Sequence, residues 1–243
     1  MAMRDEIRAE REKLRGQSLR KRLGYFYDYY KLPFFAVLLL LLLGTAFLRE
    51  LTSRKPTGFY MLFLNAEPVG DAQLAALSEN WYSLLGLDEG KQEITVDAAL
   101  RFDPEAGDEA ALAGTMRVTA LLASRSADIC ISDPKLFCYY AESGAFLDLR
   151  ELYSEEELAA YADRLCYIDR QEISSEDAEE DKNTENTGTL IRSPEGMAEP
   201  LPVGLVCEDS VLQRLGLYRD TAVFSVFANS RRQELARRLL DCF

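Results

Sequence analysis

The sequence predicts an α/β protein in which a transmembrane helix precedes a three-layer domain with a mostly parallel sheet. Residues 32–48 carry no charge and include six consecutive leucines, Leu38–Leu43. From residue 57 onward, apolar runs typical of buried strands alternate with segments of helical periodicity. Strands that are linked by helices ordinarily run parallel, with helices on both faces of the sheet.

The apolar segment 32–48 is the first predicted element. As a helix it would be about 26 Å long, near the lower limit for a bilayer crossing, and Tyr29 and Tyr30 extend it. A buried core helix and a cleaved signal peptide are the alternatives. Six consecutive leucines are unusual in a core helix, and a long polar stretch rarely precedes the apolar part of a signal peptide. A retained single-pass anchor fits the sequence better than either.

The charges predict the orientation of this anchor. Residues 1–31 hold nine Lys and Arg and five acids, a net charge of +4, whereas the part after the apolar segment has a net charge of −17. The positive-inside rule then places the N-terminus in the cytoplasm and the C-terminal domain outside the cell membrane. Residues 4–22 form either a solvated helix or, through Arg20, Lys21 and Arg22, a contact with anionic lipid. We expect a cytoplasmic basic segment at 1–31, the transmembrane helix at 32–48, a linker at 49–56 and an extracellular domain at 57–243.

The first half of the outer domain alternates between strands and helices. Asp71 and Asp108 can cap helices, and Asp133 followed by Pro134 is a typical helix start. Glycines end the first and third of these helices, near Gly86 or Gly90 and at Gly144. The expected strands are 58–66, 92–100 and 127–132, and the expected helices begin directly after the caps Asp71, Asp108 and Asp133.

The second half is less regular. Ser154 and Glu157 form a capping box, which predicts a helix to about Cys166. Acidic residues dominate the following stretch, so we expect a mobile loop at about 167–188. The remaining expected elements are a hairpin at 189–203, a short helix at 209–215, a strand at 222–229 and a terminal helix that Ser230 caps.

Three phrases of this domain resemble the extracellular solute-binding proteins of bacterial ABC transporters. They are ADICISDPKLFCYYAESGAFLDL at 127–149, EPLPVGLVCEDSVLQRLGLY at 199–218 and AVFSVFANSRRQELARRLLDCF at 222–243. The resemblance implies one lobe of a type II periplasmic binding protein, with a Leu-Pro-Val-Gly strand. Such proteins generally have two lobes, and residues 150–200 are too few for a second one. The basic, Tyr-rich and Leu-rich N-terminal part also resembles uncharacterised single-pass proteins of Gram-positive bacteria.

Polar side chains follow three of the predicted strands. Ligands of open α/β sheets bind beyond the carboxyl ends of the strands, where helix-start amides are available to an anion. The candidate ligand-binding residues are Asn65, Glu67, Ser132, Asp133 and Asn229. Helix capping is the alternative role for Asp133. It is also the alternative role for Ser230, which directly follows Asn229. A metal site is not expected, because the acidic run 176–181 lacks the ligand spacing of a calcium loop and 102–109 fits a turn.

Composition excludes several kinds of site. The 243 residues include no histidine, so no Ser-His-Asp triad, Cys-His pair or His-ligated zinc is available. The overall net charge of −13 argues against nucleic acid as a partner. The five cysteines have no metal-binding spacing and are expected to be buried thiols, although Cys166 and Cys207 are a candidate disulfide pair.

These observations favour a non-enzymatic function without a cofactor. The first hypothesis is a membrane-anchored, extracytoplasmic binding or accessory protein, a single solute-binding lobe beside a transporter or sensor protein, with a small-molecule solute as its ligand. The alternative is an interaction scaffold of a membrane complex that binds no small molecule. An enzyme with paired carboxylates is the third option, but the spacing brings no such pair together.

Overall fold

The computed structural model describes residues 33–49, 55–171, 188–207 and 211–242. The chain divides into two compact units, Met1–Lys55 and Pro56–Phe243. In the first unit, residues 33–49 form an α-helix in which every residue is exposed, including Phe34, Phe35 and Phe47. No helix within the described ranges meets the length and hydropathy that a membrane span requires. The transmembrane anchor stays a prediction.

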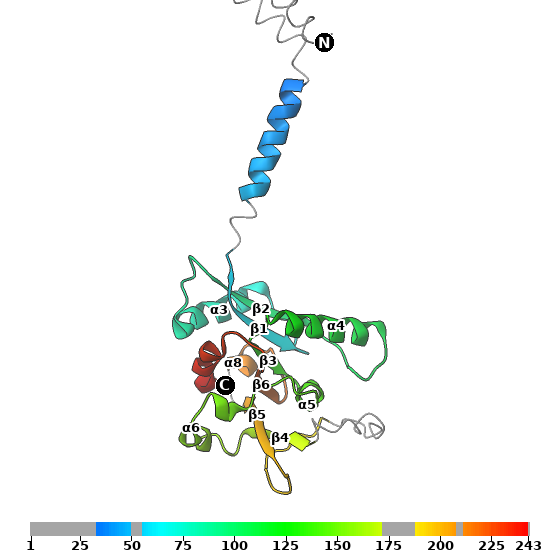
Figure 1. Ribbon diagram of the computed structural model, residues 1–243, viewed down its shortest axis with the longest axis vertical. Coiled ribbons are helices and arrows are strands. Elements are labelled where there is room, and N and C mark those ends of the chain that lie inside the picture. The colour runs from blue at the N-terminus through cyan, green and yellow to red at the C-terminus, as the bar shows by residue number, and fades with distance from the viewer. Residues whose placement is uncertain (1–32, 50–54, 172–187, 208–210, 243) are drawn as a thin grey trace, which may run out of the picture. The chain divides into compact units, whose positions relative to one another are not determined.

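The second unit is an α/β domain built on one six-stranded sheet (Figure 1). The strand order is β2-β1-β3-β6-β5-β4. The strands are β1 (Thr57–Leu64), β2 (Glu93–Leu100), β3 (Ile129–Ser132), β4 (Leu165–Asp169), β5 (Pro200–Cys207) and β6 (Ala222–Val226). The predicted α/β class is therefore confirmed for the described residues.

Helices cover both faces of the sheet, so the domain has three layers. The helical elements are α3 (Asp71–Leu85), α4 (Glu109–Ser124), α5 (Pro134–Glu142), η1 (Leu149–Glu151), α6 (Glu155–Ala159), α8 (Val211–Arg214), α9 (Gln233–Ala236) and η3 (Arg237–Cys242). Alternate residues of the strands point to opposite faces. On one face, Phe63 and Phe224 pack with Trp81 of α3 and Leu239 of η3. On the other face, the apolar cluster of the sheet includes side chains of α4 and α5.

The prediction of a mostly parallel sheet is wrong. β1 pairs in parallel with β2 and β3, but β3–β6, β6–β5 and β5–β4 are antiparallel. A strand is parallel to the one before it when a single helix carries the chain back along the sheet. Between β3 and β4 the chain passes along the sheet twice. It passes along one face as α5 and then along the other face as η1 and α6. The chain thus enters β4 at the end where it left β3.

The second half of the domain differs from its prediction in other ways too. The helix that begins at the Ser154–Glu157 capping box ends at Ala159 rather than near Cys166, and Cys166 belongs to β4. Residues 167–169 of the expected acidic loop also belong to β4, while residues 172–187 lie outside the described residues. No strand forms at residues 189–199 of the expected hairpin, all of which the structure describes. The Leu-Pro-Val-Gly strand that the resemblance implies is present as part of β5.

Candidate functional site

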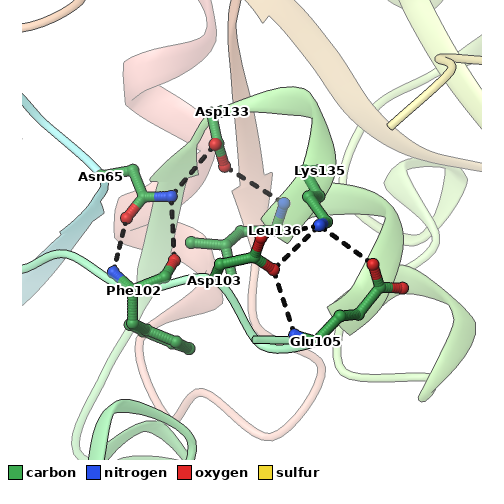
Figure 2. A network of polar contacts seen from close by, with 7 residues as sticks. All are labelled: Asn65, Phe102, Asp103, Glu105, Asp133, Lys135 and Leu136. Atoms are coloured by element: carbon green, nitrogen blue, oxygen red, sulfur yellow. Dashed lines mark hydrogen bonds and ion pairs between the residues drawn. The ribbon is translucent and has the colours of Figure 1, made fainter. Parts of the chain in front are cut away.

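Asn65 directly follows β1, and its side chain contacts the segments that follow β2 and β3 (Figure 2). Its backbone has φ +57°, a left-handed conformation that asparagine tolerates better than most residues. Its side-chain Nδ2 donates to the Phe102 carbonyl at 3.1 Å and to Asp133 Oδ2 at 3.0 Å, and its Oδ1 accepts from the Phe102 N–H at 2.9 Å. The side-chain amide of Asn65 therefore makes these three hydrogen bonds to other groups of the same chain.

Asp133 has the capping role that the sequence offered as the alternative. Its Oδ1 accepts from the Leu136 N–H at 3.1 Å, and Pro134 occupies the first turn of α5. Its Oδ2 accepts from Asn65. An aspartate at this position satisfies a first-turn amide that the helix leaves free and places negative charge at the positive end of the helix.

An ion-pair cluster lies beside these residues, as Figure 2 shows. Lys135 Nζ lies 2.8 Å from Asp103 Oδ1 and 2.9 Å from Glu105 Oε2. The Lys135 ammonium lowers the pKa of Asp103, and Asp103 and then Glu105 raise the pKa of Lys135. The sequence predicted a turn at residues 102–109. It did not predict that Lys135, the third residue after β3, would form ion pairs with this turn. The cluster holds the β2–α4 connection against the start of α5.

Glu67 is also engaged with neighbouring charges. Its carboxylate lies 3.2 Å from Arg101 Nη1 and 3.4 Å from Arg219 Nε. Arg101 also donates to the Ala66 carbonyl at 3.0 Å. The Arg219 side chain is 80% exposed, so this pair contributes little to stability. Glu67 thus joins the ends of β1 and β2 to the segment that leads into β6.

Ser132 lies inside the domain rather than at its surface. The residue is 1% exposed, and its hydroxyl has no hydrogen-bond partner within the part of the chain that the structure describes. On the same face of the sheet, Cys130 is paired across the strands with Ser225, whose hydroxyl is likewise unpartnered. A solute that binds at the rim of the sheet would not reach Ser132.

Asn229 lies at the opposite end of the sheet from the other four candidates. β6 is antiparallel to β3, so its carboxyl end lies beside the start of β3 rather than beside Asp133. There the Asn229 amide donates to the Leu122 carbonyl at the end of α4. The five candidate residues therefore do not form one site, because the expectation that they share an edge required parallel strands.

Asp128, which the sequence did not single out, is a buried carboxylate with three hydrogen-bond donors. It is fully buried and accepts from the Tyr60 N–H at 2.8 Å, from Ser230 Oγ at 2.6 Å and from Arg232 Nη1 at 2.9 Å. Arg232 also donates to the Thr57 carbonyl at 2.8 Å. The sequence feature that could have identified Asp128 is an acidic residue at the start of an otherwise apolar strand. Asp128 joins the start of β3 to the first strand and to the C-terminal segment.

A second buried carboxylate lies on β2, which β1 separates from β3. Asp97 of β2 accepts from the Tyr60 hydroxyl at 2.9 Å and from Arg117 Nη2 of α4 at 2.6 Å. Burial and the hydrogen bond to Asp97 raise the pKa of Tyr60 to about 12. Burial alone would raise the pKa of Asp97, but the bonds from Arg117 and Tyr60 outweigh it and lower that pKa. Both buried acids are therefore paired with arginine.

None of the five cysteines forms a disulfide bond. Cys166 packs on the face of the sheet that α5 covers and Cys207 on the opposite face, so the candidate disulfide between them is excluded. Across the described residues, no group of three or more Cys, Asp or Glu side chains is placed to hold a metal ion.

In comparisons with protein-family models, with curated proteins and with solved structures, nothing matches this chain. The assignment of a function therefore rests on the residues and their geometry.

Proposed function

We propose that this chain is a membrane-anchored, non-enzymatic accessory protein whose C-terminal domain lies outside the cytoplasm and acts through protein contacts. One observation favours binding to a protein over binding to a solute. The polar groups of Asn65 and Asp133, the best-placed candidates for a ligand, bond to backbone groups and to each other. A solute would have to compete with these bonds, and a buried polar group that loses its partner costs about 1–3 kcal/mol.

The anchor is supported by residues 32–48 and the charges on either side of them. The helix at 33–49 exposes Phe34, Phe35, Phe47 and a run of leucines, and contiguous exposed apolar surface of this kind favours contact with lipid or with another protein. The net charge of +4 before it favours a cytoplasmic N-terminus. The partner that we propose is a transporter or sensor protein in the same membrane.

The proposal of a non-enzymatic role is supported by the state of the buried acids. General acid–base catalysis needs a titrating group within reach of a substrate proton. Asp128 and Asp97 each form an ion pair with an arginine of the same domain, so both side chains are already engaged within the fold. The chain also contains no histidine.

Two measurements on the full chain test the proposal. The first is protease treatment of intact cells that express the chain with an epitope at each end. We expect the C-terminal epitope to be lost and the N-terminal one to be protected, and the reverse pattern would overturn the orientation.

The second measurement is thermal unfolding in the presence of sugars, amino acids and short peptides. A solute at 100 times its dissociation constant stabilises a protein by about 2.7 kcal/mol, which shifts the melting temperature by several degrees. We expect no shift. A shift that the Asp133→Asn variant abolishes would instead establish a solute-binding lobe.

A further inference from the structure

The carboxyl ends of β1 and β3 are the topological switch point of the sheet. After β1 the chain passes through α3 to β2, which pairs with β1 on one side. After β3 it passes through α5 towards β4, at the other end of the strand order. Helix α3 packs on one face of the sheet and α5 on the opposite face. Ligands of open α/β sheets bind where the connections of neighbouring parallel strands diverge in this way.

Tyr218 occupies this position. Its hydroxyl lies 2.8 Å from the carbonyl oxygen of Leu64, the last residue of β1, and 2.8 Å from the carbonyl oxygen of Ile131 in β3. The single hydroxyl hydrogen is therefore shared between the ends of the two strands. The tyrosine is 5% exposed and belongs to the apolar cluster on the face that α3 covers. It comes from a segment that is 154 and 87 positions away from these two residues along the chain.

The residues on either side of Tyr218 are bonded to the connection that follows β1. The Leu217 carbonyl accepts from the Glu67 N–H at 2.7 Å, and Leu217 is fully buried. Arg219 Nε lies 3.4 Å from the Glu67 carboxylate. Both contacts of Glu67 therefore hold the segment 217–219 in place, with the phenol ring of Tyr218 directed to the switch point.

We propose that Tyr218 is the domain's own ligand at the switch point, and that this position binds a free phenol when the tyrosine side chain is removed. The surroundings define the class of ligand. Two carbonyl oxygens accept hydrogen bonds and donate none, so the ligand must carry a donor. The rest of the ligand must be apolar, because it replaces a ring of the apolar cluster.

The same surroundings reject an anion. The first-turn amide of α5 that could hold one already donates to Asp133. Burial raises the pKa of Tyr218 well above its usual value, so the native hydroxyl is neutral. A carboxylate or a phosphate would place negative charge against two carbonyl oxygens and would lose its hydration. The position therefore differs in its chemistry from the anion site that the sequence pattern suggested.

This inference goes beyond the proposed function and does not depend on it. A solute that binds the native chain would overturn the proposed function. The inference fails instead on the behaviour of variants of Tyr218 towards phenol.

Thermal unfolding and titration calorimetry of the full chain in mild detergent test the inference, with phenol as the probe. Tyr218→Ala should lower the melting temperature, and phenol at about 100 times its dissociation constant should raise it again by several degrees. Toluene has nearly the shape of phenol but no hydroxyl, so it should bind this variant roughly tenfold more weakly. Benzoate should not bind. Phenol should not stabilise the wild-type chain, in which Tyr218 fills the position.

Tyr153 offers a matched control. It is also 5% exposed, and its hydroxyl contacts the Ala236 and Arg237 carbonyls at 3.5 and 3.2 Å rather than the strand ends. Tyr153→Ala removes the same atoms, but these contacts are longer, so phenol should bind it roughly tenfold more weakly than it binds Tyr218→Ala. Equal affinity for the two alanine variants would show a general cavity effect and would overturn the proposal.

A second variant keeps the test decisive if Tyr218→Ala folds poorly. Tyr218→Phe keeps the ring and removes only the hydroxyl, so its melting temperature should fall by several degrees. An unchanged melting temperature of Tyr218→Phe would overturn the proposal. Equal binding of toluene and phenol, or a Tyr218→Ala chain on which phenol has no effect, would overturn it as well.

Discussion

The buried pair of Asp128 and Arg232 should be a main source of stability in the outer domain. Asp128 is fully buried, and Arg232 keeps 28% of its side chain exposed. Removal of one partner from a buried ion pair costs about 3–5 kcal/mol, and the partial exposure of Arg232 favours the lower end of that range. We therefore expect Asp128→Asn to lower the free energy of unfolding by about 3 kcal/mol.

This loss is large because domains of this size are stable by only about 5–15 kcal/mol in total. Its origin can be tested with a double-mutant cycle that adds Arg232→Met. We expect the two substitutions together to cost at least about 1 kcal/mol less than the sum of the single changes, because each single change leaves the other residue unpaired.

The assay is urea unfolding of the full chain, followed by tryptophan fluorescence. The chain has a single tryptophan, Trp81, which is 3% exposed and stacks on Phe63 with ring centroids 6.3 Å apart. Its emission therefore reports on the core directly. The control is Lys91→Met, which removes an exposed pair with Asp88 and should cost less than about 1 kcal/mol. A cost for Asp128→Asn no greater than that of the control would refute the reasoning.

Three further predictions concern packing, pH and thiol state. Gly114→Ala should cost about 1–3 kcal/mol in urea unfolding, because a Cβ there would overlap the Phe102 ring, and an unchanged midpoint would contradict the close packing. The Ser154 N–H, then Arg237 and the Ser154 hydroxyl, lower the pKa of Glu157 from 4.5 to about 2, so Glu157 contributes stability above pH 4.5 that is lost as pH falls towards 2. The Glu157→Gln variant should show a shallower decline over that interval, and identical pH profiles would exclude this role. Denatured, unreduced protein should release five thiols per chain to a thiol reagent, whereas three would indicate a disulfide.

Local sequence patterns predicted most of the first half of the domain. Asp108, Asp133 and Ser154 each cap a helix as expected, because a cap depends on residues within one turn. Strand direction was not predictable in the same way. Strand direction depends on how many times the chain passes along the sheet between two strands. The single turn of α8 between β5 and β6 is too short for such a passage, so these two strands are antiparallel.

The same limit explains the candidate site. Asn65 and Asp133 were correctly placed together, since both follow strands that are parallel. Asn229 was placed with them only because β6 was expected to be parallel as well. Asp128 was missed because its partners, Tyr60, Ser230 and Arg232, are separated from it by 68 to 104 positions in the sequence. Long-range pairing of this kind leaves no local pattern.

Asn65 has a structural role in the fold, and one measurement tests that role without knowledge of any ligand. That measurement is the free energy of unfolding of the Asn65→Gly variant, in which glycine keeps the left-handed backbone at no steric cost. If Asn65 serves the fold, loss of its three hydrogen bonds should lower the stability by about 2–3 kcal/mol. Residues kept for binding are commonly neutral or costly to stability, so an unchanged or increased free energy of unfolding would contradict the account.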